Sequence, residues 1–229
     1  MVRPLRQVFP ELPHHVRQRG VRKNATFHED SDYLLYIRTL RDACIEFVVQ
    51  IWAYVLMTTH VHLIAVPKEE DSISNALQKA HTAYATYFNQ KYGFVGHLWQ
   101  SRPKMSVMDD NYAKNAIRYV ERNPVRAGMV KRAEEYLWSS AAAHCGLRGD
   151  PLLSPNPYAE EITDWSAWLA IDQSEEELLE IRRHLSTGRP WCAPEMLVQL
   201  ETMTGRSLRM RKPGRPKKSS LDDTNKLFE

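Results

Sequence analysis

Two runs of β-branched and aromatic residues, separated only by Thr58 and Thr59, constrain the fold of this 229-residue chain more than any other feature. The first run spans residues 48–57, the second spans residues 60–66, and Pro67 follows the second run at once. Two such runs with a two-residue connection predict a β-hairpin, and the proline predicts its end. We expect residues 60–66 to lie centrally in a sheet, beside the strand formed by the first run.

Four further segments surround this hairpin, two with the character of strands and two with helical spacing. Strands are expected at residues 14–20 and within 97–107, and helices at residues 30–47 and from Ser72 or Ser74 to Tyr92. Gly93 is typical of the left-handed residue that ends a helix. The order strand, helix, strand, strand, helix, strand is the ferredoxin-like pattern. The sequence therefore predicts an α+β fold, with one antiparallel sheet and helices on one face.

The rest of the chain is expected to be helical and then basic. A helix from Asp109 or Asp110 runs to about Asn123, where Pro124 stops it. A proline-rich linker after Asp150 predicts a boundary, which gives a domain at residues 1–150, a helical extension at 151–205 and a tail at 206–229. Helices are expected in the extension at residues 164–171, 175–185 and 194–203.

The composition excludes several classes of protein. No window has the long uncharged apolar run of a membrane span, and the basic N-terminus lacks the apolar stretch of a signal peptide. The three cysteines are odd in number and far apart, which argues against a disulfide framework and a cysteine zinc site. We therefore expect a soluble, cytoplasmic protein that has no membrane partner.

The pair His60 and His62 is the first candidate for chemistry. Side chains alternate along a strand, so these two imidazoles lie on one face and can reach one metal ion, while Val61 and Leu63 point into packing. A His-x-His pair is weak evidence alone, because two histidines on a half-buried strand are often packed or hydrogen-bonded. His14 and His15, on the first strand, are interpreted as solvated.

The helix that ends at Asn123 is the second candidate. Tyr119 and Asn123 stand four residues apart and therefore share a helix face, which suits a nucleophile beside a metal ligand. Three arginines surround this helix end: Arg118, Arg122 and Arg126. Most helical tyrosines are core residues, and Tyr112, two turns earlier, is the rival nucleophile.

Together these segments resemble the REP-associated tyrosine transposases, a branch of the single-tyrosine HUH endonucleases. The similarity covers about residues 14–152. The matching stretches are Tyr33-Leu34-Leu35-Tyr36, Ala53-Tyr54-Val55-Leu56-Met57, His60-Val61-His62-Leu63-Ile64, Gly96-His97-Leu98-Trp99-Gln100-Ser101-Arg102, residues 118–128 and Trp138-Ser139-Ser140-Ala141. One departure is Thr58-Thr59, where the family usually has Pro-Asn; it changes the turn but removes no ligand.

The resemblance implies a function and a site. Tyr119 would be the nucleophile, His60 and His62 metal ligands and Asn123 the third ligand. The enzyme would nick and rejoin single-stranded or hairpin DNA of palindromic repeats through a 5′-phosphotyrosine intermediate, as a monomer or homodimer. The implied metal is Mg²⁺ or Mn²⁺. By their chemistry alone, two imidazoles and one amide suit Mn²⁺ or a later transition metal better than Mg²⁺. No other small-molecule cofactor is expected.

Basic residues outside this centre predict contacts with DNA phosphates. Besides Arg118, Arg122 and Arg126 around the tyrosine helix, these contacts are Arg17 and Arg19 on the first strand and, in the tail, Arg211, Lys212, Arg215, Lys217 and Lys218. The tail residues, with their Gly-Arg-Pro core, resemble an AT-hook, which lies in the minor groove of A·T-rich DNA. A generic phosphate-binding tail remains the alternative.

Three other functions remain open from the sequence. The chain could be a DNA-binding protein derived from a transposase that no longer cuts. It could be a metal-dependent hydrolase in which water is the nucleophile and Tyr119 is structural. A ferredoxin-like regulatory domain would leave the paired motifs unexplained.

Overall fold

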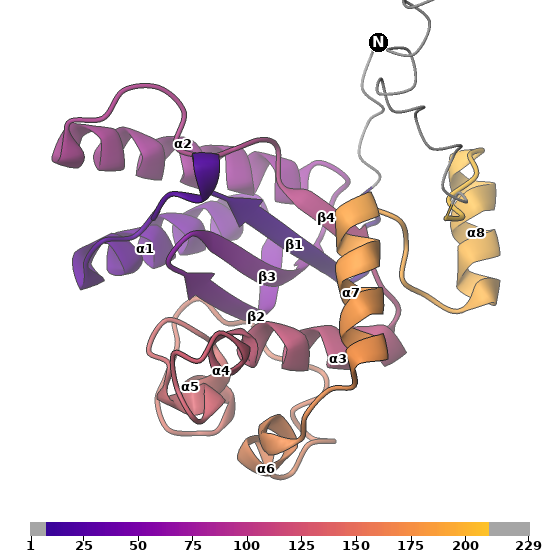
Figure 1. The fold of residues 1–229 in the computed structure, drawn as a ribbon. Helices are drawn as coiled ribbons and strands as arrows, with labels where there is room; N and C mark the ends of the chain where they lie inside the picture. The colour runs from indigo at the N-terminus through magenta and orange to yellow at the C-terminus, as the bar shows by residue number, and fades with distance from the viewer. Residues whose placement is uncertain (1–7, 211–229) are drawn as a thin grey trace, which may run out of the picture.

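The computed structural model describes residues 8–210 and contains one four-stranded sheet. The strands are β1 (His14–Arg19), β2 (Val49–Met57), β3 (His60–Pro67) and β4 (Lys104–Val107). Their order across the sheet is β2-β3-β1-β4, and each neighbouring pair is antiparallel (Figure 1). The α+β fold and its ferredoxin-like strand order are thus confirmed, with β3 inside the sheet as predicted.

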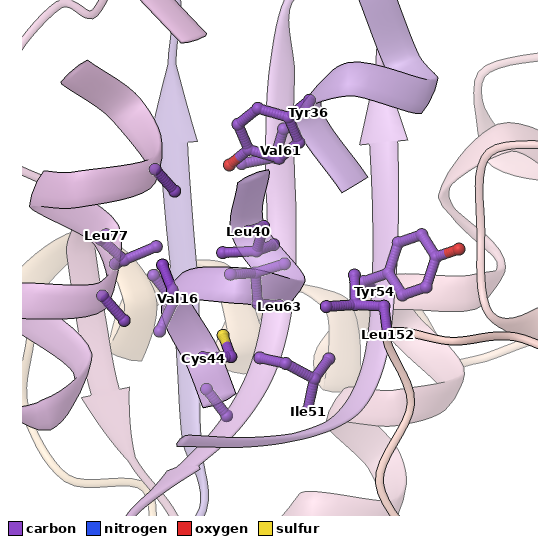
Figure 2. Packing of buried hydrophobic residues seen from close by; sticks show 14 of the residues in the cluster. Val16, Tyr36, Leu40, Cys44, Ile51, Tyr54, Val61, Leu63, Leu77 and Leu152 are labelled. Atoms are coloured by element: carbon purple, nitrogen blue, oxygen red, sulfur yellow. The ribbon is translucent and has the colours of Figure 1, made fainter. Parts of the chain in front are cut away.

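Two helices cover one face of the sheet, α1 (Asp30–Glu46) and α2 (Ser72–Tyr92). Helix α1 begins in a capping box between Glu29 and Asp32, and α2 ends at Gly93 with a φ of 68°. Apolar side chains of both helices close on alternate residues of the strands, including Val16, Val61 and Leu63 (Figure 2). This layer is the larger apolar core and matches the predicted position of the two crossover helices.

The opposite face is covered by helix α3 (Asp110–Glu121). The sequence predicted this helix but not its position on the sheet. Asp109 caps α3 by accepting a hydrogen bond from the backbone of Tyr112, as the sequence predicted. The chain then bends at Arg122 into the short helix α4 (Asn123–Arg126), in which Pro124 occupies the first turn. Helix α3 thereby sets its residues against the strand residues that α1 and α2 leave uncovered.

The segment after residue 150 packs against α3 instead of standing apart from it. Its helices are α6 (Trp165–Ala170), α7 (Glu175–Thr187) and α8 (Pro194–Thr204). Buried residues of this segment share one apolar cluster with α3 and the sheet: Tyr158, Trp165, Leu169, Leu178, Ile181 and Trp191. The boundary at residue 150 stays a prediction, but the helical extension is part of the support of α3.

Three shorter helical segments complete the chain: a 3-10 turn at Val21–Lys23, a second at Ala133–Glu135 and α5 (Ala141–His144). None of the helices within residues 8–210 combines the length and the apolar composition that crossing a membrane requires. The tail residues Arg211, Lys212, Arg215, Lys217 and Lys218 lie outside the described residues.

Candidate functional site

Strands β1 and β3 bring five polar side chains to the face that α3 covers. His62 lies opposite Arg17 in the antiparallel register, and His60 lies opposite Arg19. His15 comes from the same face of β1, because it is two residues from Arg17. Val61 and Leu63 are buried in the core on the other face, so the predicted alternation along β3 is confirmed.

His15, His60 and His62 form a compact cluster. The ring centroids of His60 and His62 are 5.2 Å apart, and those of His15 and His62 are 5.0 Å apart. Nε2 of His15 lies 2.8 Å from Nδ1 of His62, a hydrogen bond between two buried rings. The interpretation of His14 and His15 as solvated residues was wrong, since both are buried within the folded chain.

Burial keeps these imidazoles neutral at neutral pH. Burial, followed by the charges of Arg19 and Arg17, lowers the pKa of His60 to about 4. Burial, followed by the effect of Arg17 and Arg126, lowers the pKa of His15 to about 3. Burial and the neighbouring histidines hold the pKa of His62 well below its usual value. Neutral imidazole is the form that binds metal ions.

Tyr119 projects from α3 onto this histidine cluster. Its ring centroid lies 5.8 Å from that of His62 and 5.7 Å from that of His15, edge-on in both cases. The side chain is only 6 % exposed. The rival residue Tyr112 lies instead against Trp191 of the C-terminal segment, with centroids 4.6 Å apart. Of the two tyrosines, it is Tyr119 that contacts the histidines.

A buried carboxylate fixes the position of α3 next to Tyr119. Glu121 is fully buried and receives hydrogen bonds from Ser140, from His144 at 2.6 Å and from the indole of Trp165 at 2.7 Å. A buried carboxylate is tolerated only when such donors satisfy it. Glu121 therefore ties the end of the tyrosine helix to the segments that follow it.

Two side chains from α4 contact Tyr119. The guanidinium of Arg126 lies over the Tyr119 ring, 4.2 Å from its centroid, and donates to the Tyr119 carbonyl. Burial lowers the pKa of Arg126 to about 10, while the adjacent Tyr119 opposes this shift. Asn123 donates its amide hydrogen to the same carbonyl at 3.4 Å, so its amide oxygen is the atom left for coordination.

The remaining arginines of this region differ in their partners. Arg122 is 5 % exposed and donates to the Leu169 carbonyl and to Asp172. Arg118 lies over Trp168, 5.4 Å from its ring centroid, and 3.9 Å from the Glu177 carboxylate. The C-terminal extension therefore contacts both guanidiniums, which the sequence pattern could not indicate. Nε of Arg118 has no hydrogen-bond partner in the described part of the chain.

Arg17 and Arg19, in contrast, make no ion pair within residues 8–210. Nε of Arg19 is buried and has no hydrogen-bond partner in the described part of the chain. Burial and the charge of Arg19 lower the pKa of Arg17, while the proximity of Tyr119 raises it. Two partner-free cations therefore border the histidine and tyrosine cluster.

The donor set fits a divalent cation held by few protein ligands. His60 bonds through Nδ1 to the Thr59 hydroxyl at 3.0 Å, and His62 bonds through Nδ1 to His15 at 2.8 Å. In both rings Nε2 is the nitrogen that remains for a metal. Within residues 8–210 no group of three His, Cys, Asp or Glu side chains has metal-binding geometry, so a third protein donor would be an uncharged one such as Asn123.

The sequence reasoning missed His15 as a member of the site. The signal that could have found it is the antiparallel pairing of the first and third strands in a ferredoxin-like sheet. That pairing places alternate residues of the basic strand on the face of His60 and His62. The basic residues Arg17 and Arg19 were named, but the histidine two positions earlier was not connected with them.

Comparisons with known proteins agree with this arrangement. Residues 12–123 match the family model described as "Transposase IS200 like". No curated protein matches the chain. A solved structure of a REP-associated tyrosine transposase bound to a REP hairpin has a TM-score of 0.54 and 17 % identity, and the match covers 76 % of this chain and 96 % of that chain. A transposase candidate from Deinococcus radiodurans R1 has a TM-score of 0.37 and 16 % identity, over 53 % of this chain and 97 % of that chain.

The family match includes β1, β3 and all of α3, and therefore spans His15, His60, His62 and Tyr119. The likeness to the hairpin-bound transposase extends the shared fold beyond the family match. Residues 12–123 of this chain match the model of the IS200-like transposase family, and the chain shares its fold with a REP-associated tyrosine transposase.

Proposed function

We propose that this protein is a metal-dependent endonuclease and strand transferase that nicks and rejoins single-stranded or hairpin DNA through Tyr119. The observation that carries the proposal is the edge-on contact of the Tyr119 ring with His62 and His15. A helix and a sheet, distant in the sequence, meet so that one phenol faces the histidine pair. A purely structural tyrosine on α3 would pack equally well against apolar residues.

The proposed reaction is a transesterification. The Tyr119 oxygen attacks the phosphorus, the bond between phosphorus and the 3′-oxygen breaks, and the tyrosine proton leaves as the 3′-oxygen gains one. The products are a 5′-phosphotyrosine and a free 3′-hydroxyl. Because the link to Tyr119 preserves a phosphodiester, a second 3′-hydroxyl can reverse the step and join a new strand.

Charge around Tyr119 favours this attack. A free tyrosine has a pKa near 10, so the tyrosine oxygen must lose its proton during the attack on phosphorus. Arg126 lies over the Tyr119 ring, and Arg17 lies close enough to interact with it electrostatically. Both guanidiniums bring positive charge close to the phosphate that the proposed attack requires.

Arg17 and Arg19 are the proposed phosphate contacts. Neither makes an ion pair in the described residues, and Nε of Arg19 has no partner there. A scissile phosphate beside Tyr119 would supply the missing acceptor. The hairpin bound to the structurally similar transposase supports DNA as the partner. We keep the tail residues Arg211, Lys212, Arg215, Lys217 and Lys218 as further proposed contacts.

His60, His62 and Asn123 would hold the divalent metal, Mg²⁺ or Mn²⁺, with Mn²⁺ the better match to two imidazoles and an amide. When bound, the metal would supply positive charge that polarises the phosphate. The two histidines orient their Nε2 atoms for it, and the burial of both rings keeps them unprotonated. All these side chains come from one chain, so the proposed centre requires no second copy.

The test is a covalent-adduct assay with REP-like hairpin DNA and Mn²⁺. The wild type should form a protein–DNA adduct that survives denaturing electrophoresis. Tyr119→Phe should reduce the adduct and cleavage to background, because the nucleophilic oxygen is gone, while the DNA dissociation constant changes little. Tyr112→Phe is the matched control on the same helix and should leave the adduct unchanged.

Each other outcome would indicate a different nucleophile or a different activity. An adduct that persists in Tyr119→Phe and disappears in Tyr112→Phe would transfer the nucleophile to Tyr112. Cleavage without a tyrosine-linked phosphate would indicate a hydrolase that uses water. DNA binding with no cleavage in the wild type would indicate a non-cutting binding protein.

A further inference from the structure

His62 is the more deeply buried of the two proposed ligands, and one of its nitrogens is already engaged. Its side chain is 2 % exposed, as is that of His15. Nδ1 of His62 lies 2.8 Å from Nε2 of His15, so one proton lies between the two rings. The position of that proton decides what His62 presents to the site.

Only one of the two arrangements leaves His62 able to bind a cation. If His15 donates, the His62 proton must lie on Nε2, which then points a hydrogen into the site. If Nδ1 of His62 donates and His15 accepts, Nε2 of His62 carries a free lone pair. The choice between these tautomers is therefore a choice between an unsuitable and a suitable ligand.

His60 is held in a comparable way. Its Nδ1 lies 3.0 Å from the Thr59 hydroxyl, in the hairpin turn that precedes β3. That turn is itself anchored, because Gly20 and Thr26 donate backbone hydrogen bonds to the carbonyls of Thr59 and Thr58 at 3.0 and 2.8 Å. Both proposed ligands thus use Nδ1 within the protein and leave Nε2 free.

We propose that His15 is a positioning residue, which accepts the Nδ1 proton of His62 and so presents the Nε2 lone pair of His62 to the metal. This inference rests on the proposed metal-dependent function. It assigns no ligand role to His15, whose Nε2 is occupied by His62. Partners that fix the tautomer of a metal-binding histidine typically change metal affinity by about 10–100-fold when they are removed.

The primary test measures Mn²⁺ affinity of the full chain without DNA, by titration with detection of free Mn²⁺ in electron paramagnetic resonance. His15→Phe keeps an apolar ring of similar size but removes the acceptor, and should weaken Mn²⁺ binding by about 10–100-fold. His15→Gln retains an acceptor oxygen and should recover most of that loss. In cleavage assays, raised Mn²⁺ should restore kcat of His15→Phe toward that of the wild type.

The matched control is the preceding residue on β1. His14 is equally buried, but its ring bonds to the backbone of Phe9 at 3.2 Å and of Leu12 at 2.8 Å, away from His62. His14→Phe should reduce thermal stability and leave Mn²⁺ affinity unchanged. Thermal unfolding of all three variants separates loss of fold from loss of the hydrogen bond.

A second measurement requires no substitution. Long-range proton–nitrogen NMR correlation of the metal-free wild type should show His62 protonated on Nδ1. A proton on Nε2 would overturn the proposal, as would equal Mn²⁺ affinity in the wild type and His15→Phe. Equal losses in His15→Phe and His15→Gln would also overturn it and make His15 a ligand. If the wild type itself fails to bind Mn²⁺, the metal role in the proposed function fails instead.

Discussion

The two faces of the central sheet are built from alternate residues of the same strands, yet they differ in how their polar groups are satisfied. On the face under α1 and α2, the Tyr36 hydroxyl bonds to His81 at 3.0 Å and the Tyr84 hydroxyl donates to the Thr26 carbonyl at 2.6 Å. On the face under α3, Arg19 keeps a buried Nε without a partner in the described chain. The first face also keeps one unpartnered atom within residues 8–210, the Oε1 of Gln18, which lies on the same face of β1 as Val16. The second face differs in that its unpartnered group carries a positive charge, which gives it the capacity for an anionic ligand.

Because of this difference, alternate residues of the single strand β3 belong either to the apolar core or to the candidate site. Val61 and Leu63 are at most 1 % exposed and belong to the apolar core, whereas His62 faces Tyr119 and His60 lies beside His62. Because the side chains alternate, a substitution at one residue of β3 acts on one layer and leaves the other in place. Neighbouring substitutions on this strand therefore test the separation directly.

The largest expected difference is between His62→Ala and Leu63→Ala. If His62 holds the proposed metal, its loss removes charge stabilisation that is worth several kcal/mol in metal enzymes, so cleavage by His62→Ala should fall by about a thousandfold. Leu63→Ala should lower the free energy of unfolding by about 2–5 kcal/mol through loss of packing. Its cleavage rate per folded molecule should stay within about threefold of the wild-type rate, since residues of the α1 and α2 layer make no contact with the reacting groups.

Hairpin cleavage rates and urea unfolding, measured on both variants, check this reciprocal pattern. The separation of the two layers fails if Leu63→Ala loses cleavage as strongly as His62→Ala while it remains folded. It fails equally if His62→Ala retains full metal-dependent cleavage.

The sequence predicted one of these faces better than the other. The order of strands and helices and the alternation of Val61, His62 and Leu63 follow from local periodicity, and the structure confirms them. The contact of His15 with His62 depends on the register between β1 and β3, which local pattern does not encode. A single-sequence reading therefore locates a site on a strand but misses the residue that arrives from its neighbour.

The partners of Arg118 and Arg122 could not be predicted from the sequence either. Arg118 and Arg122 were grouped with the DNA contacts because they surround the tyrosine helix, yet Leu169, Asp172 and Glu177 occupy them. Those partners come from the C-terminal extension, whose packing against α3 is set by tertiary structure. Charge near a predicted site does not distinguish a ligand contact from an internal one.

An effect of intermediate size is expected on DNA binding, where Arg17→Ala and Arg122→Ala should differ. If Arg17 binds a phosphate through a charge-assisted hydrogen bond, Arg17→Ala should weaken single-stranded DNA binding by about tenfold. The slope of log affinity against log salt should fall by about 0.7, as expected for one lost contact on a single strand. Arg122→Ala should leave that slope unchanged and lower the free energy of unfolding by about 1–3 kcal/mol, because the buried Leu169 carbonyl loses its donor.

Fluorescence anisotropy at several salt concentrations and urea unfolding make the comparison. A reduced salt slope in Arg122→Ala, with unchanged stability, would return Arg122 to the DNA contacts that were predicted from the sequence.

The smallest expected effect concerns pH and the face under α1 and α2. Burial lowers the pKa of His81 to about 3, against 6.5 in an unfolded chain. Between these two values the unfolded state binds the proton and the folded state does not, so stability rises with pH; the contribution is fully present above about pH 6.5 and is lost as pH falls toward 3.

His81→Gln removes this difference and can keep the hydrogen bond to Tyr36. The unfolding free energy should then depend less steeply on pH, by about 1.4 kcal/mol per pH unit within that window. Urea unfolding of both proteins at several values between pH 4 and pH 6.5 measures the slope. An unchanged slope would mean that His81 takes up a proton without unfolding, and that burial under α1 and α2 does not exclude the proton from this residue.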